Sequence, residues 1–133
     1  KGWLVDDLAD RMSACSKNGS AFYWFQGASD EFLERAYLNC SCLLAASEAE
    51  GFGLPLIEAS FHSLPVLARD IAVFREVAGN AALYFDGGSP EGLVEGVLRW
   101  VRQKELNAIP EPAGMDTMSW QQSANALLDQ LEI

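Results

Sequence analysis

Short apolar runs and segments with helical spacing alternate along this chain. Apolar positions three to four residues apart predict helices over residues 3–15 and 30–39, and further helices behind Pro55, Pro90 and Ser119. Continuous apolar or aromatic runs predict strands at residues 21–25, 42–45, 65–68 and 82–85. Strands that alternate with helices are typical of the α/β class, here a Rossmann-like parallel sheet with helices on both faces.

Two of these elements carry more specific expectations. The run at residues 42–45 is continuously apolar, so we expect a fully buried strand there. The helix behind Pro90 is expected to carry one apolar stripe, formed by Leu93, Val97, Leu98 and Val101.

Ligands of such sheets bind beyond the carboxyl ends of the strands. The candidate binding segments are therefore the loops that follow the predicted strands, at residues 26–29, 46–53, 69–73 and 86–89.

One of these loops continues into a distinctive segment, Glu50-Gly-Phe-Gly-Leu-Pro-Leu-Ile-Glu58. Pro55 suits the first turn of a helix, and Gly51 and Gly53 allow unusual dihedrals and a close approach to the backbone. The start of that helix would offer free N–H groups and a positive dipole end to a phosphate or another electron-rich group. Two carboxylates would then flank one small pocket. The alternative is an ordinary turn between solvated glutamates.

Composition narrows the class of protein. The chain has 133 residues, half of them apolar, which suits a single domain over residues 1–133 with a real core. Its net charge of −10 argues against nucleic acid as a partner. No apolar stretch is long enough to span a membrane. The chain begins at Lys1 without a methionine, so we expect it to be a fragment of a longer protein.

The cysteines do not suggest a metal site. Cys15, Cys40 and Cys42 are accompanied by a single histidine, which leaves a zinc site without its usual ligands. We interpret the three cysteines as reduced, mostly buried thiols of a cytoplasmic protein.

The segment from Glu50 to Glu58 resembles the E-x7-E signature of retaining glycosyltransferases with the GT-B fold, especially the large family 4. Further segments resemble the same family in the same order along the chain. They are residues 24–27, 30–33, 65–68, 76–79 and 82–85 and the pair Ser119-Trp120.

The resemblance implies an N-terminally truncated, C-terminal donor-binding domain of a polysaccharide-forming enzyme. Such an enzyme transfers a hexose from a nucleotide-diphosphate sugar with retention of configuration, and the nucleotide sugar is a substrate, so no cofactor and no metal are implied. The missing N-terminal domain would hold the acceptor, and the parent enzyme could touch a membrane peripherally.

Roles follow for individual residues by motif position. Glu58 would hold the ribose hydroxyls, and Glu50 would be the catalytic residue, which stabilises positive charge at the anomeric carbon. Backbone N–H groups of the loop would bind the sugar and diphosphate, and a second loop would contact the base. The loop residues are Gly51, Phe52, Gly53 and Leu54, and the base contacts would be Gly27 and Ala28.

The chain departs from the family pattern in two respects. The family supplies an arginine and a lysine for the diphosphate from an earlier loop, and no match for them is found here. At the end of the helix after the motif, Ser63 replaces the usual glycine, so we expect a strained or altered helix end.

Two other residues invite catalytic or binding roles. His62 is the only histidine, but we expect a structural or surface role because it falls at the end of a helix. For Arg69, which follows a predicted strand, an ion pair with a neighbouring acid is favoured over a phosphate contact.

Two alternatives to the transferase remain. One is a non-catalytic module that binds a nucleotide sugar or a protein, and the other is a different GT-B chemistry, such as that of a phosphorylase or an epimerase.

Overall fold

A computed structural model of the chain describes residues 6–17, 21–25, 27–113, 115 and 120–131. The chain divides into two compact units, Lys1–Glu34 and Arg35–Ile133. The smaller unit contains α1 (Asp6–Lys17), which confirms the first predicted helix over its described part. The predicted residue Leu4 of that helix lies outside the described residues.

The aromatic residues 21–25 do not form the predicted strand, so this prediction was wrong. The backbone N–H of Trp24 donates to Oγ of Ser16 at 3.1 Å, and the rings of Tyr23 and Phe25 stack at 6.3 Å while both stay exposed. A strand needs a neighbouring strand for its backbone groups, and among the described residues only 43–85 contribute to a sheet. Aromatic residues favour strands only where such a partner is present.

The next helix, α2 (Asp30–Asn39), forms as predicted and spans the boundary between the two units. Ser29 caps it, because its Oγ accepts the backbone N–H of Phe32 at 3.3 Å.

The larger unit contains a parallel sheet of three strands in the order β1-β2-β3. These strands are β1 (Leu43–Ala45), β2 (Val66–Arg69) and β3 (Leu83–Phe85), and each matches a predicted run. The expectation of a fully buried first strand was wrong, since Leu44 is 46% exposed. The reason is its place at the edge of the sheet, where β2 is its only neighbour among the described strands.

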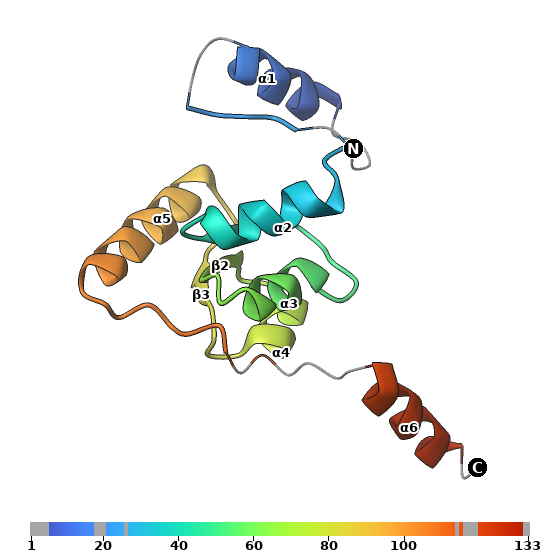
Figure 1. Ribbon diagram of the computed structural model, residues 1–133. Helices are drawn as coiled ribbons and strands as arrows, with labels where there is room; N and C mark the ends of the chain where they lie inside the picture. The colour runs from blue at the N-terminus through green and yellow to red at the C-terminus, as the bar shows by residue number, and fades with distance from the viewer. Residues whose placement is uncertain (1–5, 18–20, 26, 114, 116–119, 132–133) are drawn as a thin grey trace. The chain divides into compact units, whose positions relative to one another are not determined.

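Helices cover both faces of this sheet, as the alternation of elements predicts (Figure 1). α3 (Leu54–Phe61) and α4 (Ala72–Ala78) pack on one face, and α5 (Pro90–Glu105) packs on the other. Successive residues of β2 alternate between the two sides. Val66 and Ala68 join the core under α3 and α4, whereas Leu67 packs with Trp100 of α5.

α5 begins where predicted, and Leu93 of its predicted stripe packs against the core, but the rest of the stripe does not. Its buried residues are Gly96 and Trp100, whereas Val97, Leu98 and Val101 are exposed. A Cβ atom at position 96 would lie 2.4 Å from Cβ of Phe85, so this glycine lets the helix approach β3 closely. Close contact at Gly96 turns the large ring of Trp100 toward the sheet.

The end of α3 confirms the expectation about Ser63. This serine adopts a φ of 53°, in the left-handed region that favours glycine. The N–H of Leu64 donates to the carbonyl of Ala59 at 2.9 Å, and that of Ser63 donates to Ser60 at 3.1 Å. This pair of bonds is a Schellman motif, which here is completed by a serine at a strained backbone position.

The last helix, α6 (Trp120–Gln130), also forms where it is predicted, and its leucines Leu127 and Leu128 are exposed. Its expected cap, Ser119, lies outside the described residues.

The three cysteines are thiols outside any disulfide, but they are not mostly buried as expected. Cys15 and Cys40 are exposed, because they lie in α1 and just before β1 rather than in the core. Cys42 is half-buried, and its burial raises the pKa of the thiol to about 11.

Candidate functional site

The loop that follows β1 leads directly into α3, as the glycine motif predicts. Gly53 precedes the helix with φ 78° and ψ 35°, and Pro55 lies in the first turn. Gly53 is buried, and a Cβ atom there would approach the ring of Phe74 to 3.3 Å. Gly51 faces open space and has no such constraint. Backbone angle and packing therefore require a glycine at position 53 but not at position 51.

Three backbone N–H groups at the start of α3 have no hydrogen-bond partner among the described residues. Within the described part of the chain, no hydrogen bond uses the N–H of Phe52, Gly53 or Leu54. Phe52 and Leu54 are 60% and 58% exposed, whereas Gly53 between them is buried. The positive end of a helix dipole adds to the attraction for an electron-rich group.

Glu50 lies at the entrance to this loop and is half-buried. The hydroxyl of Ser47 donates a hydrogen bond of 2.7 Å to its Oε1. This bond orients one oxygen of the carboxylate, and the other oxygen has no hydrogen bond among the described residues.

Glu58 lies in the second turn of α3, about one turn into the helix as predicted. The phenol of Tyr37, in α2, donates a hydrogen bond of 2.7 Å to its Oε2. Burial and the neighbouring carboxylate together raise the pKa of Tyr37 well above its ordinary value. The ring of His62 stacks on that of Tyr37, with centroids 5.3 Å apart and an interplanar angle of 7°. His62 is thus part of a packed cluster at the end of α3.

Arg69, at the carboxyl end of β2, connects the two neighbouring loops. Its Nε donates to the carbonyl of Ala46, after β1, at 3.1 Å, and its Nη1 donates to the carbonyl of Gly87, after β3, at 2.7 Å. The predicted ion pair with a neighbouring acid was wrong, because Asp70 pairs with Arg75 instead. A Cβ atom at position 87 would lie 2.3 Å from Nη1, so the glycine makes room for this guanidinium.

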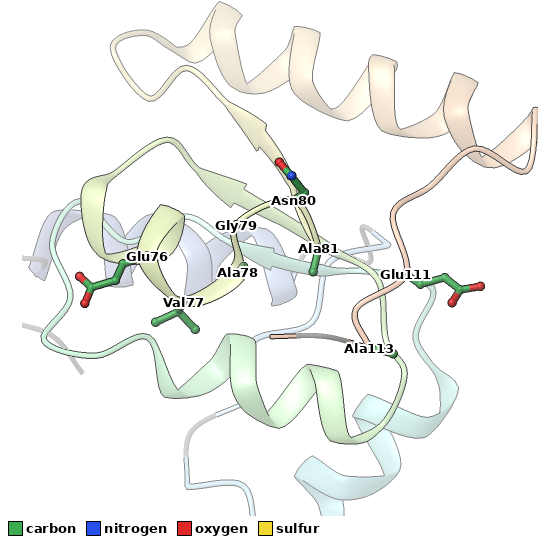
Figure 2. A pocket seen from close by; sticks show the side chains of 8 residues that line it. All are labelled: Glu76, Val77, Ala78, Gly79, Asn80, Ala81, Glu111 and Ala113. Atoms are coloured by element: carbon green, nitrogen blue, oxygen red, sulfur yellow. The ribbon is translucent and has the colours of Figure 1, made fainter. Parts of the chain in front are cut away.

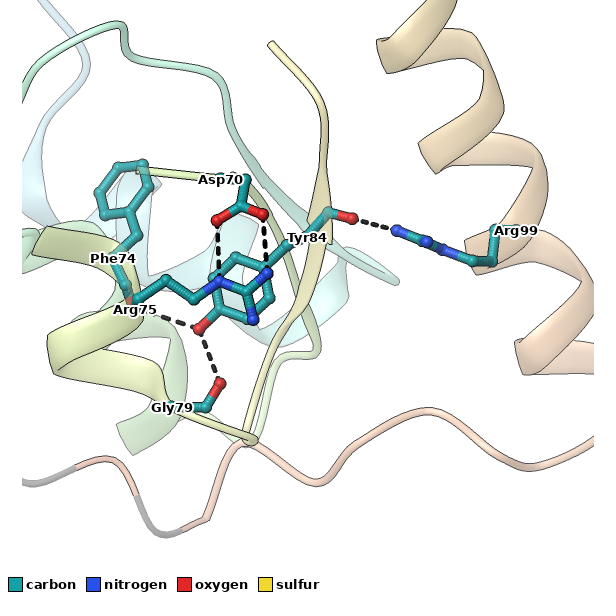
Figure 3. Close-up of polar contacts among 6 residues, drawn as sticks. All are labelled: Asp70, Phe74, Arg75, Gly79, Tyr84 and Arg99. Atoms are coloured by element: carbon teal, nitrogen blue, oxygen red, sulfur yellow. Dashed lines mark hydrogen bonds and ion pairs between the residues drawn. The ribbon is translucent and has the colours of Figure 1, made fainter. Parts of the chain in front are cut away.

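A second polar cluster joins α4 to β3 (Figure 3). Arg75 donates two hydrogen bonds to Asp70, at 2.8 and 2.7 Å, and its guanidinium lies 3.8 Å from the ring centroid of Tyr84. The hydroxyl of Tyr84 is within hydrogen-bonding distance of the carbonyl oxygens of Phe74, at 3.2 Å, and Gly79, at 2.8 Å. Burial raises the pKa of Tyr84. The Asp70 carboxylate, the Arg75 guanidinium and the Tyr84 hydroxyl thus each have a partner within the protein.

A hollow of about 470 Å³ lies at the N-terminal end of β3, away from the loops that follow the strands (Figure 2). It is formed by the end of α4, the connection to β3 and residues near Glu111. Its two carboxylates, from Glu76 and Glu111, lie on different sides and point away from each other (Figure 2). The hollow contains neither the glycine loop nor any cation, so it does not correspond to the predicted pocket.

The remaining predicted contacts, Gly27 and Ala28, belong to the smaller unit. Gly27 has a φ of 69° and is exposed. Their role as base contacts stays a prediction.

Neither a metal cluster nor a membrane span is found in the described residues. No three acidic, cysteine or histidine side chains gather there in a way that could hold a metal ion. Among the described helices, none combines the length and the apolar character needed to cross a membrane.

The sequence had not drawn attention to Tyr37 or Ser47. Tyr37 falls at an apolar position of the predicted helix over residues 30–39, and a buried phenol usually requires a hydrogen-bond partner, which is the signal that could have identified it. Ser47 precedes Glu50 by three residues, a spacing at which side chains in a turn can meet.

The sequence is similar to a known protein family and to several characterised relatives. The family described as "Glycosyl transferases group 1" matches residues 7–115. A serotype-specific mannosyltransferase, WbdA of Escherichia coli, is 41% identical over all 133 residues, which cover 16% of its length. The O-antigen chain mannosyltransferase RfbU of Salmonella typhimurium is 46% identical over 52 residues, which are 39% of this chain and 15% of the relative.

A more distant relative matches as well. The O-antigen chain mannosyltransferase B of Escherichia coli is 26% identical over 115 residues, which are 86% of this chain and 30% of the relative. The chain therefore spans less than a third of the length of each of these curated relatives.

Proposed function

The chain belongs to the glycosyl transferases group 1 family, and on this premise we propose that it is the donor-binding part of a retaining hexosyltransferase. Residues 1–133 would form part of the C-terminal domain of a GT-B enzyme. A separate N-terminal domain would bind the acceptor and close the cleft.

One observation carries this proposal: two carboxylates border a loop whose backbone N–H groups are free at a helix start. Glu50 precedes the loop and Glu58 follows it in α3, while the N–H groups of Phe52, Gly53 and Leu54 have no partner among the described residues. A nucleotide sugar presents hydroxyls at both ends and a diphosphate between them. Carboxylates accept bonds from hydroxyls, and N–H groups of a helix start bind phosphate oxygens.

These groups suit the chemistry of glycosyl transfer. As the bond between the anomeric carbon and the diphosphate breaks, negative charge grows on the leaving oxygen and positive charge grows on the sugar. Free N–H groups would stabilise the first charge, and the Glu50 carboxylate would stabilise the second. Ser47 would keep that carboxylate oriented. Retention follows if the acceptor attacks on the face from which the diphosphate departs.

The relatives suggest which hexose to test first. All three are named as mannosyltransferases, and two of them as O-antigen chain mannosyltransferases. We therefore take mannose as the first hexose and a growing polysaccharide as the first acceptor.

The experiment is a titration of the 133-residue chain with nucleoside diphosphates and their mannose esters, followed by ¹⁵N NMR. Binding should shift the amide signals of Phe52, Gly53 and Leu54. Glu58→Ala should lose most of that binding, whereas Glu105→Ala, which removes an exposed acid at the end of α5, should retain it. Equal binding by Glu58→Ala and the unchanged chain would refute the ribose assignment.

The same chain should not transfer sugar by itself, because the acceptor domain and the cations for the diphosphate are missing from it. Measurable transfer by the 133-residue chain would contradict this expectation. A longer protein that joins this chain to an acceptor-binding domain should transfer mannose. Failure of that protein to do so, with donor binding intact, would favour the non-catalytic binding module.

A further inference from the structure

We infer that Tyr37 is a positioning residue for Glu58, fixing the carboxylate so that its second oxygen can accept a ribose hydroxyl. This inference rests on the proposed function. It adds a residue from α2, outside the glycine motif, to the donor site.

The contact itself is direct. The phenol of Tyr37 donates to Oε2 of Glu58 at 2.7 Å, although the two residues are 21 positions apart in the chain. No hydrogen bond of the described residues reaches Oε1 of Glu58. One oxygen of the carboxylate is therefore held by the protein, while the other keeps its capacity to accept a bond.

Tyr37 is well placed to hold a flexible side chain. It is only 9% exposed and belongs to the core cluster that includes Leu56 and Ala59 of α3. The ring of His62 lies flat against its ring, so the phenol is confined between α3 and the residue that follows its C-terminal turn. Glu58 itself is half-buried and has three side-chain torsions to restrict. A rigid partner reduces the entropy that a ligand must otherwise remove from the carboxylate.

A purely structural role for the same bond makes a different prediction. If Tyr37 only stabilised the fold, its loss would weaken the binding of every ligand alike. If it orients Glu58 toward the ribose, its loss would weaken only the ligands that carry ribose hydroxyls. The two roles are therefore separated by the sugar of the nucleotide.

The test measures dissociation constants of the 133-residue chain for guanosine diphosphate and for its 2′,3′-dideoxy counterpart, with the uridine and adenosine pairs run in parallel. The unchanged chain should prefer the ribose form by about tenfold, the effect of a hydrogen bond to a charged group. In Tyr37→Phe this preference should fall to about twofold, because the bond can still form but the carboxylate is no longer held. The affinity for the dideoxy form should not change.

Two further variants serve as control and safeguard. Tyr84→Phe also removes a buried tyrosine hydroxyl, but one that contacts the carbonyls of Phe74 and Gly79, so it should keep the full ribose preference. His62→Ala removes the stacking ring and keeps the phenol, so it should lower the preference by less than Tyr37→Phe does. It also keeps the inference testable if Tyr37→Phe fails to fold.

The outcomes separate the positioning role of Tyr37 from the proposed donor-binding function. An unchanged ribose preference in both Tyr37→Phe and His62→Ala would overturn the positioning role while leaving the proposed function intact. An equal loss of affinity for both forms of the nucleotide would also overturn it. If the unchanged chain binds none of the nucleotide pairs, the proposed function fails, and the role of Tyr37 fails with it.

Discussion

Two buried tyrosines anchor two polar clusters of this chain, and the clusters differ in whether their groups are satisfied. The Tyr84 hydroxyl donates to a backbone carbonyl, that of Gly79 being the nearer at 2.8 Å, while Arg75 above its ring is paired with Asp70. Tyr37 donates to a carboxylate, whose second oxygen has no hydrogen bond among the described residues. Both hydroxyls have raised pKa values, and both residues are 9% exposed.

The difference separates stabilising groups from groups that can bind a ligand. In the closed cluster around Tyr84, the Tyr84 hydroxyl and the Arg75–Asp70 pair bond to partners within the protein, so the cluster mainly connects α4 with β3. In the open cluster around Tyr37, the protein holds Glu58 from one side only. Perturbed pKa values alone would not have distinguished the two, because burial raises both.

Phe74 connects the two regions, and the largest expected effect tests that connection. Its ring lies next to Gly53, at the start of the helix that carries Glu58. Its carbonyl contacts the hydroxyl of Tyr84. Gly53→Ala should cost about 2–3 kcal/mol of unfolding free energy, because it combines a left-handed backbone with a tight contact. Gly51→Ala, which meets open space, should cost no more than about 0.5 kcal/mol. Urea denaturation measures both, and equal costs would show that the loop is independent of the core.

The second prediction compares the two hydroxyls directly. Tyr84→Phe should destabilise the chain by about 1–2 kcal/mol, because it leaves a part-buried carbonyl oxygen, that of Gly79, without its donor. Tyr37→Phe should cost about 0.5–1 kcal/mol, because water can replace the phenol at the half-buried Glu58. The same urea titrations provide the values. The reverse order would mean that the open cluster, rather than the closed one, is the main source of stability.

The third prediction concerns the strained end of α3, beside the open cluster. Ser63→Gly should stabilise the chain by about 0.5–1 kcal/mol, because glycine adopts the observed φ of 53° without a steric penalty. Ser60→Gly, within α3, is the matched control and should destabilise the helix. Thermal unfolding followed by circular dichroism distinguishes the two. A loss of stability in Ser63→Gly would show that the serine side chain contributes more than its backbone costs.

The smallest effect tests the ion pair of the closed cluster. Arg75 lowers the pKa of Asp70 below its ordinary value of 3.8, so the pair stabilises the fold above that pH and is lost as the pH falls through the lowered pKa. Since both side chains are about half exposed, Asp70→Asn should cost at most about 0.5–1 kcal/mol at neutral pH. This cost should vanish toward pH 2, as measured by urea titrations at several pH values. A cost that is independent of pH would show that the hydrogen bonds, not the charges, matter.

The sequence correctly predicted those elements that are determined by signals within a few residues. Three strands, the start of α3 at the glycine motif and the start of α5 were placed correctly, because apolar spacing, caps and prolines act over a few residues. The strand at residues 21–25 was wrong, since a strand depends on a partner that its own residues do not specify.

The contacts that shape the site could not be predicted, because they also join residues that are distant in the sequence. Tyr37 meets Glu58 across 21 positions, and Arg69 meets Ala46 and Gly87 across 23 and 18 positions. Such pairs depend on which helix faces which loop after folding. A single sequence identifies that both partners are polar, but not that they meet.

The packing of Gly53 has a consequence for how this signature is used to recognise enzymes. Because the backbone and the Phe74 ring both require a glycine at that position, a descendant that had lost its sugar substrate would still retain it. Gly51 and the Glu50 carboxylate carry no comparable requirement from the core, so they would be free to drift in such a pseudoenzyme. A genome survey that relies on Gly53 therefore counts folded domains, whereas under the proposed function Glu50 and Gly51 would report on donor binding.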